Sequence, residues 1–234
     1  MSTITVPEPI TSSFDPADRL RQLRIRIAGR LRLGLRNEST RLGLRRDLTQ
    51  PFPAPTAKIP ISVRPLVEAD LPVLLAVDDA TSPEDQYEIA CRRALAAKRM
   101  AGAFVAVDER DGRPCYVQWL FGAADNDFVR RLKGFPQLGA DEALLEGAYT
   151  PASHRGLGIM PAAMGLIAEK GETIGARYVI TFVAPDNIPS LKGCQRCGFS
   201  PDLMHRLVGL GFGLFRRDNF TKLAADDPRR TQKF

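Results

Sequence analysis

R-G-L-G-I-M-P, residues 155–161, is the stretch of this sequence that decides the fold. It follows an apolar run that ends in Tyr149-Thr150-Pro151, and it opens a helical pattern over 162–174. Glycines let a backbone come close to a ligand, and the first amides of a helix point outward unpaired, which suits a negative charge. Proline is well placed in a first helical turn. A strand, a glycine turn and a helix start therefore predict a phosphate-binding loop.

The loop is neither of the two common nucleotide-binding loops. A P-loop needs a Lys-Ser or Lys-Thr pair after its glycines, and none follows here. The dinucleotide loop needs a third glycine, and position 161 is proline. The stretch resembles instead the pyrophosphate loop of the GNAT acyltransferases, in which Gln or Arg is followed by Gly three residues on and by Gly or Ala two residues later. Arg155 and Gly158 match this pattern, and Met160 departs from its last position.

A second segment carries the same resemblance. Asn187, Ser190, Gly198 and Phe199 match the GNAT motif of an asparagine, a small residue three positions on and a closing Gly-Phe. Further upstream, residues 61–71 resemble the family's first strand and the start of its first helix. The resemblance covers about residues 58–222. It implies an α/β fold of mixed α+β type, with a central mixed sheet of about seven strands flanked by helices.

The residue patterns allow a coarse assignment of elements. Apolar runs and turn signals predict strands over 60–66, 103–107, 115–121, 143–150, 177–183, 202–209 and 211–220. Helical spacing predicts helices over 69–79, 83–99, 158–175 and 187–197, with a short helix within 125–137. This order fits the implied fold.

Positive charge is concentrated at the N-terminus. Residues 1–60 carry 11 Lys or Arg and 5 Asp or Glu, so this segment holds the whole net charge of +6. Within 15–47, Leu20, Leu23, Ile27, Leu31 and Leu35 share one helical stripe, although local alternation also permits a strand. We predict three parts: a basic, partly disordered or amphipathic arm with a proline-rich linker over 1–57, an acyltransferase domain over 58–222 and a tail over 223–234.

The composition limits the expected location of the protein, the state of its cysteines and its metal content. No apolar stretch reaches the roughly 18 residues of a membrane helix, and the N-terminus lacks the pattern of a signal peptide, so we expect a cytoplasmic protein, peripheral at a membrane if the arm binds there. Cys91, Cys115, Cys194 and Cys197 are expected to be reduced. Cys194-x-x-Cys197 lacks the further ligands of a zinc site, so no metal is expected.

The resemblance implies coenzyme A, with acetyl-CoA as co-substrate. Arg155 and the backbone amides of Gly156, Leu157, Gly158, Ile159 and Met160 would hold the pyrophosphate. The backbone of Ala148, Tyr149 and Thr150 would bind the pantetheine, and one of these amides would polarise the thioester carbonyl. Asn187 and Ser190 would contact the cofactor where the central strands separate.

Two residues are candidates for proton transfer. Glu146 lies on the strand before the loop, where family members often place a carboxylate, and it would serve as general base for the acceptor amine. The family often protonates the leaving thiolate with a tyrosine at the position held here by Cys194. A paired strand carboxylate and a packed helix cysteine remain the alternatives.

Three functions stay open. The first is acetyl transfer from acetyl-CoA to a primary amine of a small molecule, such as an amino sugar or amino-acid derivative. The second uses a longer acyl donor, including one on an acyl carrier protein. The third is a non-catalytic GNAT-like module whose basic arm binds a membrane or nucleic acid. Under the first two, the arm is a candidate for contact with a membrane or an acidic protein, nucleic acid is not expected, and a homodimer stays open.

Overall fold

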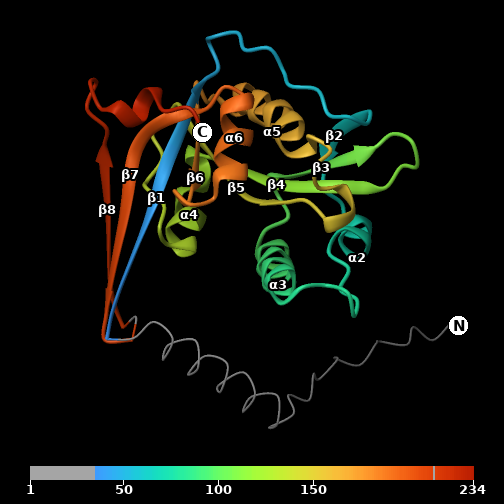
Figure 1. The fold of residues 1–234 in the computed structure, drawn as a ribbon, viewed down its shortest axis with the longest axis horizontal. Coiled ribbons are helices and arrows are strands. Elements are labelled where there is room, and N and C mark those ends of the chain that lie inside the picture. Colours follow the sequence, from blue (N-terminus) through green and yellow to red (C-terminus); the bar gives the residue numbers. More distant parts are fainter. Residues whose placement is uncertain (1–34, 213) are drawn as a thin grey trace, which may run out of the picture. The chain divides into compact units, whose positions relative to one another are not determined.

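The computed structural model describes residues 35–212 and 214–234, and its described part is built on one eight-stranded mixed sheet (Figure 1). The strands are β1 Arg36–Asp47, β2 Ile61–Pro65, β3 Ala103–Asp108, β4 Pro114–Gly122, β5 Glu142–Tyr149, β6 Tyr178–Val183, β7 Ser200–Leu210 and β8 Phe215–Lys222. They lie in the order β2-β3-β4-β5-β6-β1-β7-β8.

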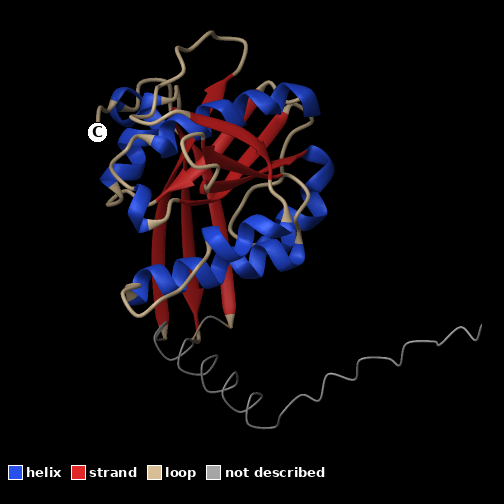
Figure 2. Cartoon of the chain, turned by 90° about the vertical axis from the view of Figure 1, so that its right-hand side faces the viewer, coloured by secondary structure: helices blue, strands red, loops and turns tan. Residues whose placement is uncertain are grey.

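Helices cover both faces of this sheet (Figure 2). They are α2 Leu71–Leu74, α3 Pro83–Lys98, α4 Asn126–Leu132, α5 Ile159–Glu169 and α6 Ile188–Arg196, with 3-10 turns at Glu68–Asp70, Ala123–Asp125, Ala152–His154, Lys170–Ile174 and Pro228–Thr231. One core cluster joins α5 and α6 to the sheet, and the other joins α2, α3 and α4 to the opposite face. None of the helices in the described ranges is long and apolar enough to cross a membrane.

The contacts divide the chain into two compact units. One consists of Thr40–Arg206 with Asp218–Phe234, and it contains the helices and most of the sheet. The other consists of Met1–Ser39 with Leu207–Arg217, of which residues 35–39, 207–212 and 214–217 are described. In this second unit Leu35, Leu214 and Phe215 are exposed. Every feature of the site below lies in the first unit.

The strand β1 corrects the expected boundary of the N-terminal arm, because residues 36–47 of that arm belong to the sheet. Leu42, Leu44 and Arg46 alternate along it and are buried, while Arg45 lies 3.4 Å from the centre of the Tyr178 ring. Antiparallel pairing with β6 over residues 42–47 supplies partners for its backbone groups. With β1 the sheet has eight strands, one more than the seven expected, and its first strand lies before residue 58. The helical stripe from Leu20 to Leu31 lies outside the described residues.

The helix predicted over 69–79 is shorter than expected. A 3-10 turn leads into α2, which ends at Leu74. The side chain of Asp78 then accepts hydrogen bonds from the Ala80 amide at 3.1 Å and the Thr81 hydroxyl at 2.7 Å. Such local side-chain bonds stabilise a turn in place of another helical turn.

Candidate functional site

The site begins with a bulge in β5. The register between β4 and β5 shifts from Val117 opposite Tyr149 to Trp119 opposite Glu146, so β5 has one more residue than β4 in this interval. Gly147 lies within it at φ +72°, and an added Cβ would lie 2.9 Å from the Trp119 ring. Only glycine fits this bulge without displacing the tryptophan.

Arg92 of α3 holds the bulge from one side. Its Nε donates to the Gly147 carbonyl at 3.2 Å, and its Nη2 donates to the Ala148 carbonyl at 2.9 Å. A salt bridge with Glu88 holds the same guanidinium. Two successive carbonyls thus face one side chain, whereas a regular strand would point them in opposite directions.

The parallel strands β5 and β6 separate next to the bulge. Their pairing extends only from Glu142 opposite Tyr178 to Leu144 opposite Ile180. Beyond that point lies a cavity of about 170 Å³, here called the inner cavity, whose wall includes Gln118, Glu146, Thr181 and Cys194. A larger opening of about 650 Å³, the outer cleft, runs from there to the glycine loop. Ala148, Met160, Asn187 and Ser190 line both, so the two spaces adjoin.

The outer cleft collects most of the predicted cofactor residues. Its wall includes Ala148, Tyr149, Thr150, Arg155, Gly156, Gly158, Ile159, Met160, Asn187 and Ser190. Leu157 is the exception, and its carbonyl accepts a hydrogen bond of 2.8 Å from the Lys58 amide of the proline-rich linker. The linker therefore braces the loop from outside the cleft.

Backbone conformation builds the phosphate end of this cleft. Gly156 and Gly158 have φ of +76° and +73°, which favours glycine at both positions. Gly158 is the N-cap of α5, and no side chain caps this helix. The first amides of α5 are therefore free to bind an anion, as the loop pattern predicts.

Arg155 has a structural partner in addition to its place on the cleft wall. Its guanidinium forms a two-pronged ion pair with Asp85 of α3, and its Nε donates to the Thr150 carbonyl at 3.1 Å. The hydrogen bond from Arg155 holds the pKa of Asp85 below its ordinary value. Arg155 thus anchors the loop to α3.

The asparagine motif has a clear local role. The Asn187 side chain accepts a hydrogen bond of 3.2 Å from the Ser190 amide and so caps α6. The cap places both residues at the junction of the outer cleft and the inner cavity.

The structure brings both predicted proton-transfer residues to the inner cavity but gives them different surroundings. Glu146 is half-buried, and desolvation raises the pKa of its carboxyl despite the Gly147 amide and the charges of Arg41 and Arg92. Burial also raises the pKa of the Cys194 thiol, whose Sγ lies 3.9 Å from the Met164 sulfur. The raised pKa makes the Glu146 carboxylate a stronger base than a free carboxylate, and Cys194 stays a neutral, packed thiol.

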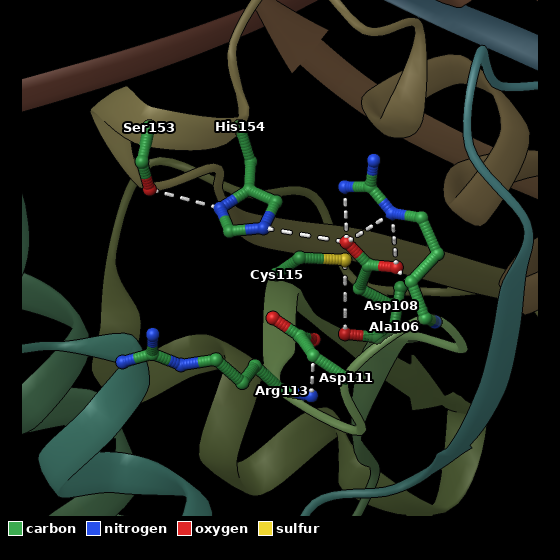
Figure 3. Close-up of polar contacts among 8 residues, drawn as sticks. Ala106, Asp108, Asp111, Arg113, Cys115, Ser153 and His154 are labelled. Atoms are coloured by element: carbon green, nitrogen blue, oxygen red, sulfur yellow. Dashed lines mark hydrogen bonds and ion pairs between the residues drawn. The ribbon is translucent and has the colours of Figure 1, made fainter.

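A second polar group lies beside the loop (Figure 3). His154 Nδ1 lies 2.9 Å from the Ser153 hydroxyl, and His154 Nε2 lies 3.8 Å from Asp108 Oδ2. Asp108 accepts bonds of 2.9 and 2.6 Å from Arg110, which lowers the pKa of Asp108 to about 2. The aspartate is therefore committed to arginine and lies beyond hydrogen-bonding distance of the imidazole, so the three residues do not form a hydrolase triad.

Sequence reasoning did not single out Arg92, Tyr116 or Gln118. The chain has 33 Lys and Arg residues, and nothing local distinguishes the one that meets the bulge. Tyr116 and Gln118 lie in a strand that is buried throughout. The only sequence signal that they share is their spacing of two residues, which places them on the same face of the strand.

Comparison with known proteins agrees with this geometry. The model of the Acetyltransferase (GNAT) family matches residues 76–199, more than half of the chain. The chain belongs to the GNAT acetyltransferase family, which confirms the resemblance seen in its two motifs. No curated protein matches its sequence.

Solved structures resemble the chain at low sequence identity. A GCN5-related glucosamine N-acetyltransferase region of a fungal multi-domain GH3 β-N-acetylglucosaminidase matches with a TM-score of 0.54 at 15% identity, over 84% of this chain and 23% of that one. A GCN5-related N-acetyltransferase from Sphaerobacter thermophilus has a TM-score of 0.46 at 18% identity, over 82% and 56%. A GNAT-family acetyltransferase from Colwellia psychrerythraea has a TM-score of 0.48 at 12% identity, over 87% and 74%. The chain thus spans about half of the Sphaerobacter protein and a quarter of the fungal one.

Proposed function

We propose that this protein transfers an acetyl group from acetyl-CoA to a primary amine of a small molecule by direct attack. The observation that carries the proposal is the connection between the two spaces: a cleft with free helix amides at one end leads to a small cavity with a half-buried carboxylate at the other. This is the layout that an extended thioester and its acceptor require.

The loop would hold the donor mainly through backbone groups. Amides at the start of α5 and in the glycine turn would bind the pyrophosphate, with the helix dipole adding to their attraction. The backbone of Ala148 to Thr150 would bind the pantetheine. No group of three or more metal-ligating side chains occurs in the part of the chain that the structure describes, and acyl transfer to an amine requires none.

Glu146 would take a proton from the acceptor nitrogen, either from its ammonium form before attack or from the amine as the new bond forms. The nitrogen forms a bond to the thioester carbon, the bond from carbon to sulfur breaks, and the sulfur leaves as a thiolate. A thiol of pKa about 8.5 leaves without much help, so the reaction does not depend on Cys194 as an acid. The inner cavity of about 170 Å³ favours a short acyl group over a long chain.

A direct test combines binding with donor choice. Calorimetry with acetyl-CoA measures binding, and thiol release with an amine panel compares acetyl-CoA, a long-chain acyl-CoA and an acylated carrier protein. We expect micromolar binding and turnover with acetyl-CoA. Turnover only with the acylated carrier protein would show that the carrier protein, and not acetyl-CoA, is the acyl donor. Absence of binding and of turnover with every donor would favour the non-catalytic module.

The basic N-terminal segment supports a separate proposal, that the residues before β1, 1–35, hold the protein against an anionic membrane or an acidic protein. Its excess of positive charge, and the roughly 1 kcal/mol that each basic residue contributes at such a surface, motivate it. Flotation with anionic vesicles, comparing the full chain with a variant whose arginines at 19, 21, 24 and 26 are replaced by glutamine, tests it. Equal flotation of the two proteins would contradict the proposal. We also propose a cytoplasmic location, which cell fractionation would check, and a homodimer, which sedimentation would check.

A further inference from the structure

Two buried polar side chains of β4 form a pair on the face that meets α5 and α6. Tyr116 and Gln118 are 0% and 1% exposed. The Tyr116 hydroxyl donates a hydrogen bond of 2.7 Å to Gln118 Oε1. In this arrangement the amide oxygen faces the tyrosine and the amide nitrogen points the other way.

The nitrogen of this amide is turned toward the inner cavity. Gln118 Nε2 has no hydrogen-bond partner among the described residues, yet it is not one of the fully enclosed unsatisfied atoms, which are Asn37 Oδ1 and the Nε atoms of Arg45, Arg46 and Arg99. Gln118 lines the inner cavity, so its free N–H groups face that space. A buried amide without a partner destabilises a fold, and an apolar residue of the same shape would avoid this.

The reaction proposed above needs a donor in this place. Gln118, Glu146 and Ala148 of the bulge all lie on the wall of the same small cavity. If Glu146 accepts the proton of the amine, the thioester carbonyl lies within the same space. Its oxygen gains negative charge as the carbon–nitrogen bond forms.

We propose that Gln118 is a catalytic residue that donates a hydrogen bond from Nε2 to the thioester carbonyl oxygen, and that Tyr116 is the residue that positions it. The inference rests on the proposed acetyl transfer. As the nitrogen attacks, the electron pair of the carbonyl moves to oxygen, and it returns when the carbon–sulfur bond breaks. Gln118 gives up no proton. Its amide is already oriented by Tyr116, so little reorganisation is needed as the charge develops.

Two substitutions that nearly keep the shape of Gln118 distinguish the loss of its hydrogen-bond donor from a loss of packing. Gln118→Met removes both polar atoms, and Gln118→Glu keeps an acceptor for the Tyr116 hydroxyl but removes the donor. We expect kcat to fall by about 10²–10³ in both, as for other lost oxyanion donors, with the Kd of acetyl-CoA within about threefold of wild type. Thermal unfolding monitors the fold, and Gln118→Met decides the matter if the buried glutamate prevents folding.

Tyr116→Phe tests the positioning role. It keeps the Gln118 donor but frees its rotation, so we expect kcat to fall by about tenfold with unchanged acetyl-CoA binding. The double variant Tyr116→Phe/Gln118→Met should be no slower than Gln118→Met, because residues that act through one another are not additive. A merely structural tyrosine would add its effect to that of Gln118→Met.

Two results would overturn the inference. One is a Gln118→Met protein with kcat within about threefold of wild type, and the other is a fall in kcat/KM matched by an equal loss of acetyl-CoA affinity. Failure of the proposed function looks different, because wild type itself would then neither bind acetyl-CoA nor release thiol from any donor.

Discussion

The outer cleft and the inner cavity adjoin, but they are built from different parts of the chain. The phosphate end of the outer cleft consists of backbone amides, set by two left-handed glycines and an uncapped helix start. The groups proposed to act in the inner cavity are the side chains of Glu146 and Gln118, which a bulge and neighbouring residues hold in place. A backbone site accepts almost any side chain at its non-glycine positions, whereas a side-chain site depends on each residue and on what supports it.

Glu146→Gln should have the largest effect on the rate of the reaction, and it should change the inner cavity without affecting the outer cleft. It keeps the shape and removes the base, so we expect kcat to fall by about 10²–10⁴ at neutral pH while acetyl-CoA affinity stays the same. Wild-type activity should decline as pH falls through the raised pKa of this carboxyl. Steady-state rates against pH, with calorimetry for binding, check both. Activity within about threefold of wild type at pH 7 would remove Glu146 from the mechanism.

The same substitution should separate catalysis from stability. Because the folded pKa of Glu146 is raised above its ordinary value of 4.5, the folded protein binds this proton more tightly, and stability falls as pH rises from that value through the folded pKa. Glu146→Gln escapes this loss. We expect its Tm at pH 7 to equal or exceed that of wild type, and a clear decrease in Tm would contradict the account of its burial.

Gly158→Asp should disrupt the glycine-loop end of the outer cleft, which is built from backbone amides. An aspartate would strain a φ of +73° and set a negative charge at the start of α5. We expect the Kd of acetyl-CoA to rise by at least about 100-fold, or roughly 2.7 kcal/mol. Gly175→Asp is the matched control, since its φ is +80° with nothing within 4 Å and it lies outside both spaces. Equal loss of binding in the two variants would mean that strain, not charge, is the cause.

Arg92→Lys should sharpen the link between bulge and cavity. A lysine keeps the charge near Glu146 but cannot donate to two carbonyls in the fixed fork of a guanidinium. We expect kcat to fall by about tenfold and unfolding free energy to fall by about 1–2 kcal/mol. Denaturant unfolding and saturated rates check this, and an unchanged kcat would show that the bulge keeps its shape without Arg92.

Cys194→Ala should have the smallest effect. The thiol is buried with a raised pKa, so it is a poor proton donor at neutral pH. We expect kcat within about threefold of wild type and a stability loss of roughly 1 kcal/mol from the removed sulfur. A drop of kcat beyond tenfold, with normal binding, would give Cys194 the acid role.

The sequence by itself determined the backbone half of the site and most of the fold. The glycine loop, the start of α5, the short helix that follows Asn187 and the buried strands were all readable, because short-range sterics and local periodicity dictate these conformations. The family resemblance, together with its place on the strand before the loop, identified Glu146 as a candidate.

Only the tertiary structure decided the rest. Residues 36–47 form a strand because β6 offers a buried edge with which residues 42–47 pair. Arg92 meets the bulge, and Gln118 meets the cavity, only because β5 has an extra residue relative to β4 and separates from β6. Side chains from several elements converge according to strand register, and register depends on contacts between residues far apart in the chain, which no local pattern encodes.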